Sequence, residues 1–206
     1  LLLSLVLIGF AVAGSNVELR FSLDELGPVW SPVGVPIVLA VVVGSMPQAM
    51  LVTALGYLLD RATWRRGRCL AIETAGLGAM SAGGAALLAH AAGLRFDSPG
   101  AALVSAIAAT SLFLVLDALT YAVWYHLESH TGGYVLQCFV SAAPIDVTFT
   151  TVAVLVTGPF VHSPFVVVVV LAGCQLAIYA LYRLVTSEAR HRRQSERRQM
   201  TMLVIG

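Results

Sequence analysis

Three carboxylic acids lie within long apolar stretches of the chain, where an ionised side chain is costly. Asp146 lies near the middle of one stretch, two residues after Pro144, and Asp117 lies just past the middle of another. Glu73 is in the first turns of a third stretch. Ionisable residues at such depths usually face the interior of a helical bundle or a cavity, and they mark candidate functional sites.

We predict that Asp117 and Asp146, together with Tyr121 and Thr150, form a site for a small ligand or for a proton. The alternative is that the two acids form only interhelical hydrogen bonds with Thr, Tyr or Gln side chains. No arginine lies at an equal depth in the sequence. An ion pair is therefore not the expected partner of either acid.

One pair of histidines has the spacing of a metal site. His126 and His130 are four residues apart and would share a helix face, with Glu128 between them on another face. His90 and His162 are expected near the opposite membrane surface, so a single site cannot collect enough ligands. We predict no metal and no other cofactor, and we place the pair at a helix end, where the dipole favours a charged imidazole.

Several reaction classes are excluded by residues that the chain lacks. All twelve basic residues are arginine, so a lysine Schiff base to retinal or pyridoxal phosphate is impossible and the protein is no rhodopsin. The sequence has no GxSxG, no HExxH and no phosphate loop. The arginines are confined to the edges of the apolar stretches, so nucleic acid is not an expected partner. We predict no enzyme activity in these residues.

The three cysteines occur singly in apolar sequence, and no CxxC pair is present. This pattern predicts free thiols that act as small buried hydrophobic side chains, not disulfides or a zinc site. The cysteines are Cys69, Cys138 and Cys174.

Composition indicates that the elements positioning these residues are surrounded by lipid. The chain has 206 residues, of which 58% are hydrophobic and 11% are charged, whereas a soluble domain has about 25% charged residues. We predict an all-α, polytopic transmembrane helical bundle with about seven spans. The apolar stretches are residues 1–14, 28–44, 47–60, 69–93, 99–125, 135–157 and 164–184.

The second and third stretches are too short to span a bilayer separately. They meet at Gly44-Ser-Met-Pro47 and form either a hairpin of two short helices or one span with a re-entrant half. Before them, apolar and polar residues alternate from Val17 to Leu23, which predicts an interfacial strand or hairpin arm.

The arginines predict the orientation of the chain. One cluster occupies residues 61–68 and another residues 183–198. Four full spans separate them, so both lie on one side, which the positive-inside rule identifies as the cytoplasm. We therefore expect a multi-pass protein of the bacterial inner membrane with a cytoplasmic C-terminus. Counting the hairpin as two spans places Arg20 inside and only Arg95 outside, whereas the re-entrant alternative places Arg20 outside.

Small residues and one proline predict how two of the helices pack. Ala75, Ala79 and Gly83 recur every four residues on one helix face, and Gly76 and Gly84 would widen that strip. Such strips allow close helix approach in lipid.

Pro144 should kink the sixth span. The backbone carbonyls that the proline frees need hydrogen-bond partners, and three threonines are close enough in sequence to provide them. They are Thr148, Thr150 and Thr151.

The last span continues into a polar helix. Residues 185–200 are rich in Arg, Glu and Gln and contain no Pro or Gly. We divide the chain into a transmembrane domain, residues 1–184, and a cytoplasmic juxtamembrane linker helix, residues 185–206. The linker is either held near anionic lipid or connects to a signalling domain. Because both ends of the chain lie in apolar runs, we expect it to be part of a longer protein.

The run of residues 38–60, followed by the basic loop, resembles a known membrane module. The Gly44–Pro47 hinge, the ending Gly56-Tyr-Leu-Leu-Asp60 and the later run around Asp117 are similar to the N-terminal multi-span module of bacterial cyclic-dinucleotide signalling proteins, of the HD-type phosphodiesterase and diguanylate cyclase kinds. The module more often has Asn at the position of Asp117 and lacks the two residues between Gly44 and Pro47. The hinge also resembles substrate-capture subunits of vitamin importers.

The first resemblance implies a membrane-embedded sensory or anchoring domain whose output domain lies beyond Gly206. Its expected partners are the lipid bilayer, a second copy in a homodimer and an unidentified small ligand. The alternative function is a small-solute transporter or capture subunit, with Asp117, Asp146 and Tyr121 lining its pocket.

Overall fold

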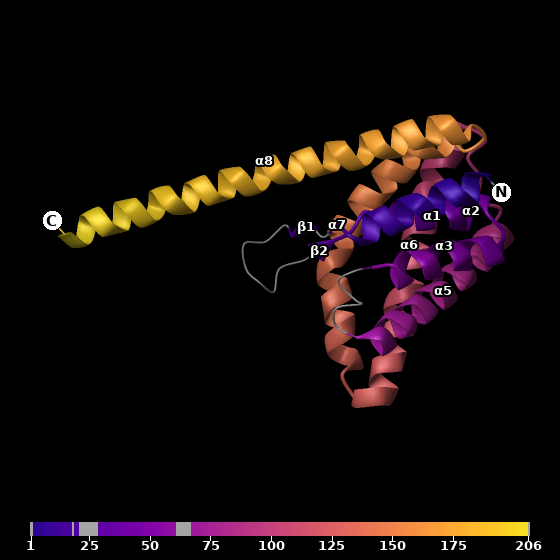
Figure 1. Ribbon diagram of the computed structural model, residues 1–206, viewed down its shortest axis with the longest axis horizontal. Helices are drawn as coiled ribbons and strands as arrows, with labels where there is room; N and C mark the ends of the chain where they lie inside the picture. The colour runs from indigo at the N-terminus through magenta and orange to yellow at the C-terminus, as the bar shows by residue number, and fades with distance from the viewer. Residues whose placement is uncertain (1, 18, 21–28, 61–66, 206) are drawn as a thin grey trace.

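The computed structural model describes residues 2–17, 19–20, 29–60 and 67–205, and these form a helical bundle with one protruding helix (Figure 1). The predicted all-α class is confirmed. Four of the helices are long and apolar enough to cross a membrane, and they coincide with the four long stretches expected from the sequence. The α-helices are α1 (Leu2–Ser15), α2 (Gly34–Val43), α3 (Met46–Leu58), α5 (Arg68–Ala91), α6 (Pro99–Ser129), α7 (Gly132–Thr157) and α8 (Pro164–Ile205).

Two short strands follow α1. Strand β1 (Leu19–Arg20) pairs in antiparallel fashion with β2 (Val29–Trp30), in the register Leu19–Trp30 and Arg20–Val29. Strand β1 lies within the predicted strand segment, whereas β2 lies at the start of the predicted apolar stretch 28–44; residues 18 and 21–23 are outside the described residues.

Helix α2 lies at the centre of the bundle and is buried on all sides. Every residue from Val35 to Val42 is buried, and α2 contacts α1, α3, α5, α6 and α7. A helix that is apolar around its whole circumference needs apolar neighbours on every side. Here those neighbours are other helices, so ten residues suffice although they cannot span a bilayer.

Helices α2 and α3 form a hairpin of two short helices. At the turn, Gly44 caps α2 in an extended conformation, and the backbone N–H of Ser45 donates to the Gln48 side chain at 2.7 Å in a capping box that starts α3. The Ser31 hydroxyl, just before α2, and the Leu59 carbonyl, just after α3, both bond to the C-terminal end of α1. The chain therefore enters α2 and leaves α3 at the same end of the bundle.

Close packing joins α3 to α5. Ala75 and Ala79 are buried, and a Cβ atom built on Gly83 would approach the Met50 side chain of α3 to 2.8 Å. Gly84 faces Leu116 of α6 instead. The expectation that Gly76 widens the strip is wrong, because Gly76 is exposed and has open space beside it.

A tight turn connects α6 to α7. His130 ends α6 in the left-handed conformation, with φ 57°. A Cβ atom on Gly132 would collide with the carbonyl oxygen of Ala122, so only glycine allows the two helices to approach this closely.

Pro144 lies inside α7, which remains one helix from Gly132 to Thr157. Proline has no N–H for the carbonyl four residues earlier, which is that of Val140. The Thr148 hydroxyl donates to the Pro144 carbonyl at 2.7 Å. This threonine therefore does not serve the carbonyl that the proline frees, as the sequence led us to expect.

Helix α8 packs beside α7 and α1 and then continues far beyond the bundle (Figure 1). Its 42 residues correspond to about 63 Å at 1.5 Å per residue, roughly twice the thickness of a hydrocarbon core.

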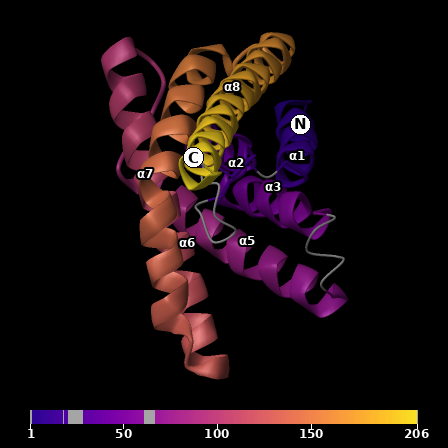
Figure 2. The same cartoon turned by 90° about the vertical axis from the view of Figure 1, so that its left-hand side faces the viewer.

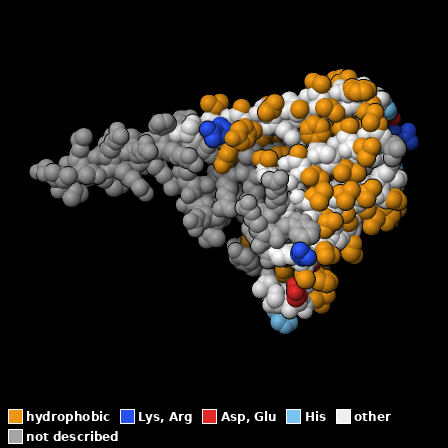
Figure 3. Space-filling view, in the orientation of Figure 1, with side chains coloured by type: hydrophobic (Ala, Val, Ile, Leu, Met, Phe, Trp, Pro, Cys, Tyr) orange, Lys and Arg blue, Asp and Glu red, His pale blue; other side chains and the backbone are white. Residues whose placement is uncertain are grey.

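Hydrophobic side chains cover much of the bundle surface. Figure 3 shows them spread over one face, with the described Arg, acidic and His side chains at its margins. The thiols of Cys69 and Cys138 belong to this exposed surface and that of Cys174 is half-buried; all three are free. The prediction of free thiols is confirmed, but the prediction that they are buried is wrong for the first two.

Candidate functional site

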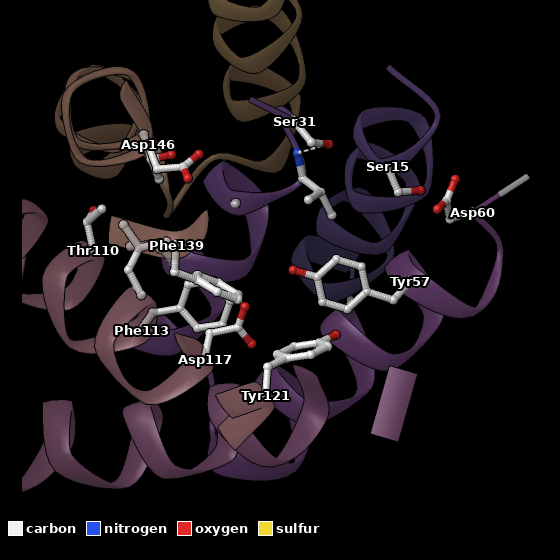
Figure 4. A pocket seen from close by; sticks show the side chains of 15 residues that line it. Ser15, Ser31, Tyr57, Asp60, Thr110, Phe113, Asp117, Tyr121, Phe139 and Asp146 are labelled. Carbon is white, nitrogen blue, oxygen red and sulfur yellow. Dashed lines mark hydrogen bonds between the residues drawn. The ribbon is translucent and has the colours of Figure 1, made fainter. Parts of the chain in front are cut away.

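The four residues predicted to bind a ligand line one pocket. Asp117 and Tyr121 come from α6, and Asp146 and Thr150 come from α7. The pocket has a volume of about 290 Å³ and is also lined by residues at the ends of α1 and α3 and at the start of α2. Figure 4 shows side chains from these elements converging on it.

One face of α6 forms a wall of the pocket. Thr110, Phe113, Asp117 and Tyr121 all line the pocket, and their spacing of three, four and four residues keeps them on one side of a helix. The sequence analysis identified only Asp117 and Tyr121, although the same helical spacing could also have identified Thr110 and Phe113.

Asp117 is the most buried acid of the pocket, with only 5% of its surface exposed. Its Oδ1 atom has no hydrogen-bond partner among the described residues, and neither has Oγ1 of Thr110. Buried polar atoms usually have partners, so two unpaired ones in the same pocket indicate a place where a ligand group can bind.

Tyr121 is held in place by its own contacts. Its hydroxyl donates to the Thr74 carbonyl of α5 at 3.1 Å, and its ring packs against Phe139 of α7 with centroids 5.9 Å apart. The aromatic ring, and not the hydroxyl, is therefore the part that Tyr121 presents to the pocket.

Tyr57, at the end of α3, was missed by sequence reasoning. Its ring lies directly over Gly78 of α5, where any Cβ atom would collide with it, and its hydroxyl points into the pocket (Figure 4). The signal that could have found it is Gly78 itself, because a glycine in a helix interior often marks close approach by another group. Ser15, Ser31 and Asp60 also line the pocket and were missed.

Asp146 and Thr150 form the α7 wall, one helical turn apart. Asp146 is half-buried. A Cβ atom on Gly34 would lie 3.3 Å from the Thr150 hydroxyl oxygen, so the start of α2 approaches α7 closely at this point.

The pocket is acidic and aromatic. Three carboxylic acids line it, Asp60, Asp117 and Asp146, and no basic side chain is among its described lining residues. In a low-dielectric interior an acid is stabilised by an opposite charge or by hydrogen-bond donors. The arrangement therefore suits a cation or a polyhydric molecule. No group of three potential metal-binding residues exists in the described part of the chain.

The other candidate residues lie elsewhere. Glu73 contacts Tyr125 near the end of α6 and does not line the pocket. His126 and His130 lie with ring centroids 5.7 Å apart at the α6–α7 turn. Comparison of the chain with protein-family models, curated proteins and solved structures finds no match.

Proposed function

We propose that this chain is the membrane-embedded sensory domain of a bacterial signalling protein, in which occupancy of the pocket changes the packing of α8. The observation that carries the proposal is the continuity of α8, one helix of 42 residues that begins beside α7 and α1 and leaves the bundle. A continuous helix transmits rotation or translation, and shifts of about 1–2 Å are common in switching transitions.

The pocket and α8 are linked through α7. Asp146 and Thr150 line the pocket, and α8 packs against the same helix. A ligand that draws Asp146 toward α6 would move the surface on which α8 rests. In this proposal the basic end of α8 lies in the cytoplasm, the domain resides in the inner membrane, and the output domain follows residue 206.

The proposal is tested in a fusion protein in which a diguanylate cyclase catalytic domain follows α8. Inserting two residues after Ser187 rotates everything beyond by about 200°, whereas seven residues restore the helical phase to within about 20°. We expect the two-residue insertion to change cyclase output and the seven-residue insertion to preserve it. Equal output from both insertions, and from Asp117→Asn, would refute signalling through α8.

The pocket itself favours a second function, small-solute transport or capture. A transporter binds its substrate among helices with polar interruptions, and Asp117, Asp146 and Tyr121 line a pocket among helices here. An uptake assay in proteoliposomes that contain the purified chain distinguishes the two functions. Solute uptake that is lost in Asp146→Asn supports transport, whereas no uptake together with phase-dependent output supports the sensory function.

A further inference from the structure

A second cavity adjoins the acidic pocket and opens between α6 and α7. It has a volume of about 320 Å³, and its walls are apolar except for Ser111 and Asp146. We call it the α6–α7 groove. Val115, Leu119 and Val140 line it, and these side chains are 55%, 49% and 65% exposed, so the groove opens on the apolar outer surface of the bundle.

Asp146 stands where the two cavities meet. It lines both the pocket and the groove, as do Leu114 and Phe139. A carboxylic acid beside an opening toward hydrocarbon is costly unless a cation or a donor accompanies it. Asp146 therefore marks the place where the charged part of a ligand would meet its apolar part.

Two buried polar atoms of the acidic pocket also lack hydrogen-bond partners among the described residues. Oδ1 of Asp117 and Oγ1 of Thr110 are buried without hydrogen bonds to described residues. Figure 4 shows the Asp117 carboxyl group pointing toward the space beside Tyr57 and Tyr121. A cationic donor placed there would pair with Oδ1 of Asp117 and contact aromatic rings, which attract cations.

We propose that the two cavities together bind an amphiphilic cation, a molecule with an ammonium head and a hydrocarbon chain. The head lies between Asp117 and Asp146 in the pocket, and the chain lies in the α6–α7 groove with access from the bilayer. The inference deepens the proposed function, because it names the chemical class of the signal. A small hydrated cation would use the pocket but not the groove, and a neutral lipid would use the groove but leave the acids unpaired.

The test uses the whole chain in nanodiscs of zwitterionic lipid and a dodecylammonium probe with a photoreactive diazirine at the end of its chain. Unlabelled dodecylammonium, ethylammonium and dodecanol compete with the probe, and the labelled peptides are mapped. We expect saturable labelling around Leu119 and Val140. Dodecylammonium should compete at least tenfold better than ethylammonium or dodecanol, which corresponds to a difference in binding free energy of about 1.4 kcal/mol. Labelling that does not saturate, or equal competition by dodecanol or ethylammonium, overturns the proposal.

Matched variants locate the head and the chain. Asp117→Asn and Asp146→Asn should each weaken competition about tenfold, whereas Asp146→Glu should retain binding and Glu128→Gln, an exposed acid of α6 outside both cavities, should have no effect. Val140→Trp should block the groove, and Val152→Trp, at a position of α7 that is 55% exposed and lines neither cavity, serves as its control. Each variant is first shown to be monodisperse and helical. Equal binding by wild type, Asp146→Asn and Val140→Trp contradicts the inference.

Failure of this inference and failure of the proposed function give different results. If dodecylammonium does not bind but insertions in α8 still act according to helical phase, the ligand class is wrong and the sensory function stands. If dodecylammonium binds as predicted but the insertions have no effect, the site is real and signalling through α8 is wrong.

Discussion

Helices α5 and α8 are both long and apolar, yet they relate to the rest of the protein in opposite ways. In the most apolar stretch of α5, 56% of the residues are buried inside the protein, compared with 11% in α8. Figure 2 shows α1, α3 and α5 on one side of the bundle and α7 along the other, with α8 between α1 and α7 in the upper half of the view. The pocket lies between these regions, and in our proposal the more closely packed side holds one wall while α8 moves.

The largest difference between the two regions should appear when a leucine is truncated. Leu39 of α2 is fully buried, and Leu176 of α8 is 67% exposed. In lipid, moving an apolar side chain between the protein interior and its surroundings changes the free energy little, because both are apolar. The cost of truncation is therefore mainly that of the cavity left behind. We expect Leu39→Ala to lower the free energy of unfolding by about 2–3 kcal/mol and Leu176→Ala by less than about 0.5 kcal/mol. Unfolding in mixed micelles measures both, and equal losses would contradict the contrast.

A pair of glycines on α1 probes the closely packed side. A Cβ atom on Gly14 would lie 2.7 Å from the backbone nitrogen of Val33, whereas Gly9 has open space. Because the backbone cannot yield as a side chain can, Gly14→Ala should destabilise the protein by about 2 kcal/mol. Gly9→Ala should be neutral or slightly stabilising, since alanine favours helix. If both substitutions are neutral in the same unfolding assay, the contact between α1 and residues 32–33 is wrong.

A second glycine pair tests the wall at Tyr57. A Cβ atom on Gly78 would collide with the Tyr57 ring, and the exposed Gly76 on the same helix has nothing near it. Gly78→Ala should cost about 1 kcal/mol, because a ring moves more easily than backbone, and it should weaken dodecylammonium binding. Gly76→Ala should leave binding unchanged and be neutral or slightly stabilising, since alanine favours helix. Photolabel competition is the decisive measurement, and unchanged binding in Gly78→Ala would show that Tyr57 does not contribute to the site.

The smallest effects should come from two threonines of α7, and they should have opposite signs. The Thr157 hydroxyl donates to the Ala153 carbonyl at 2.7 Å, whereas Oγ1 of Thr151 is buried and has no hydrogen-bond partner among the described residues. Thr157→Val should lower the free energy of unfolding by about 0.5–1 kcal/mol, and Thr151→Val should raise it by a similar amount. A destabilising Thr151→Val would show that this hydroxyl has a partner.

The sequence predicted the helices well because apolar length is a direct property of the residues. The apolar parts of α5, α6 and α7 follow from hydrophobic runs, and the continuity of α8 follows from the absence of Pro and Gly in residues 185–200. At Gly44 the sequence left a hairpin and a re-entrant half as alternatives, and the structure shows two short helices. The depth of Asp117 and Asp146 in their stretches also placed them at comparable levels, and the structure places both in one pocket.

Which side chains are buried or line the pocket depends on which face of each helix meets a neighbour. In lipid, hydrophobicity does not reveal that face. Lipid-facing and protein-facing side chains are equally apolar, so Cys69 and Cys138 were wrongly expected to be buried. For the same reason the apolar sequences of α2 and α8 do not reveal that α2 lies at the centre of the bundle and α8 at its edge. Tyr57 was missed because its place in the pocket depends on α3 crossing α5 at Gly78.

Distances between spin labels test the central claim, that the pocket separates a fixed side from a movable one. Labels at Leu59, at the end of α3, and at Leu87 report on α3 and α5, and labels at Leu87 and Leu176 report on α5 and α8. All three side chains are at least 49% exposed in the structure, and the native cysteines are replaced. In nanodiscs, the double variant Asp117→Asn, Asp146→Asn should leave the first distance unchanged and shift the second by about 2 Å. A shift in the α3–α5 distance, or no shift in the α5–α8 distance, would contradict the account.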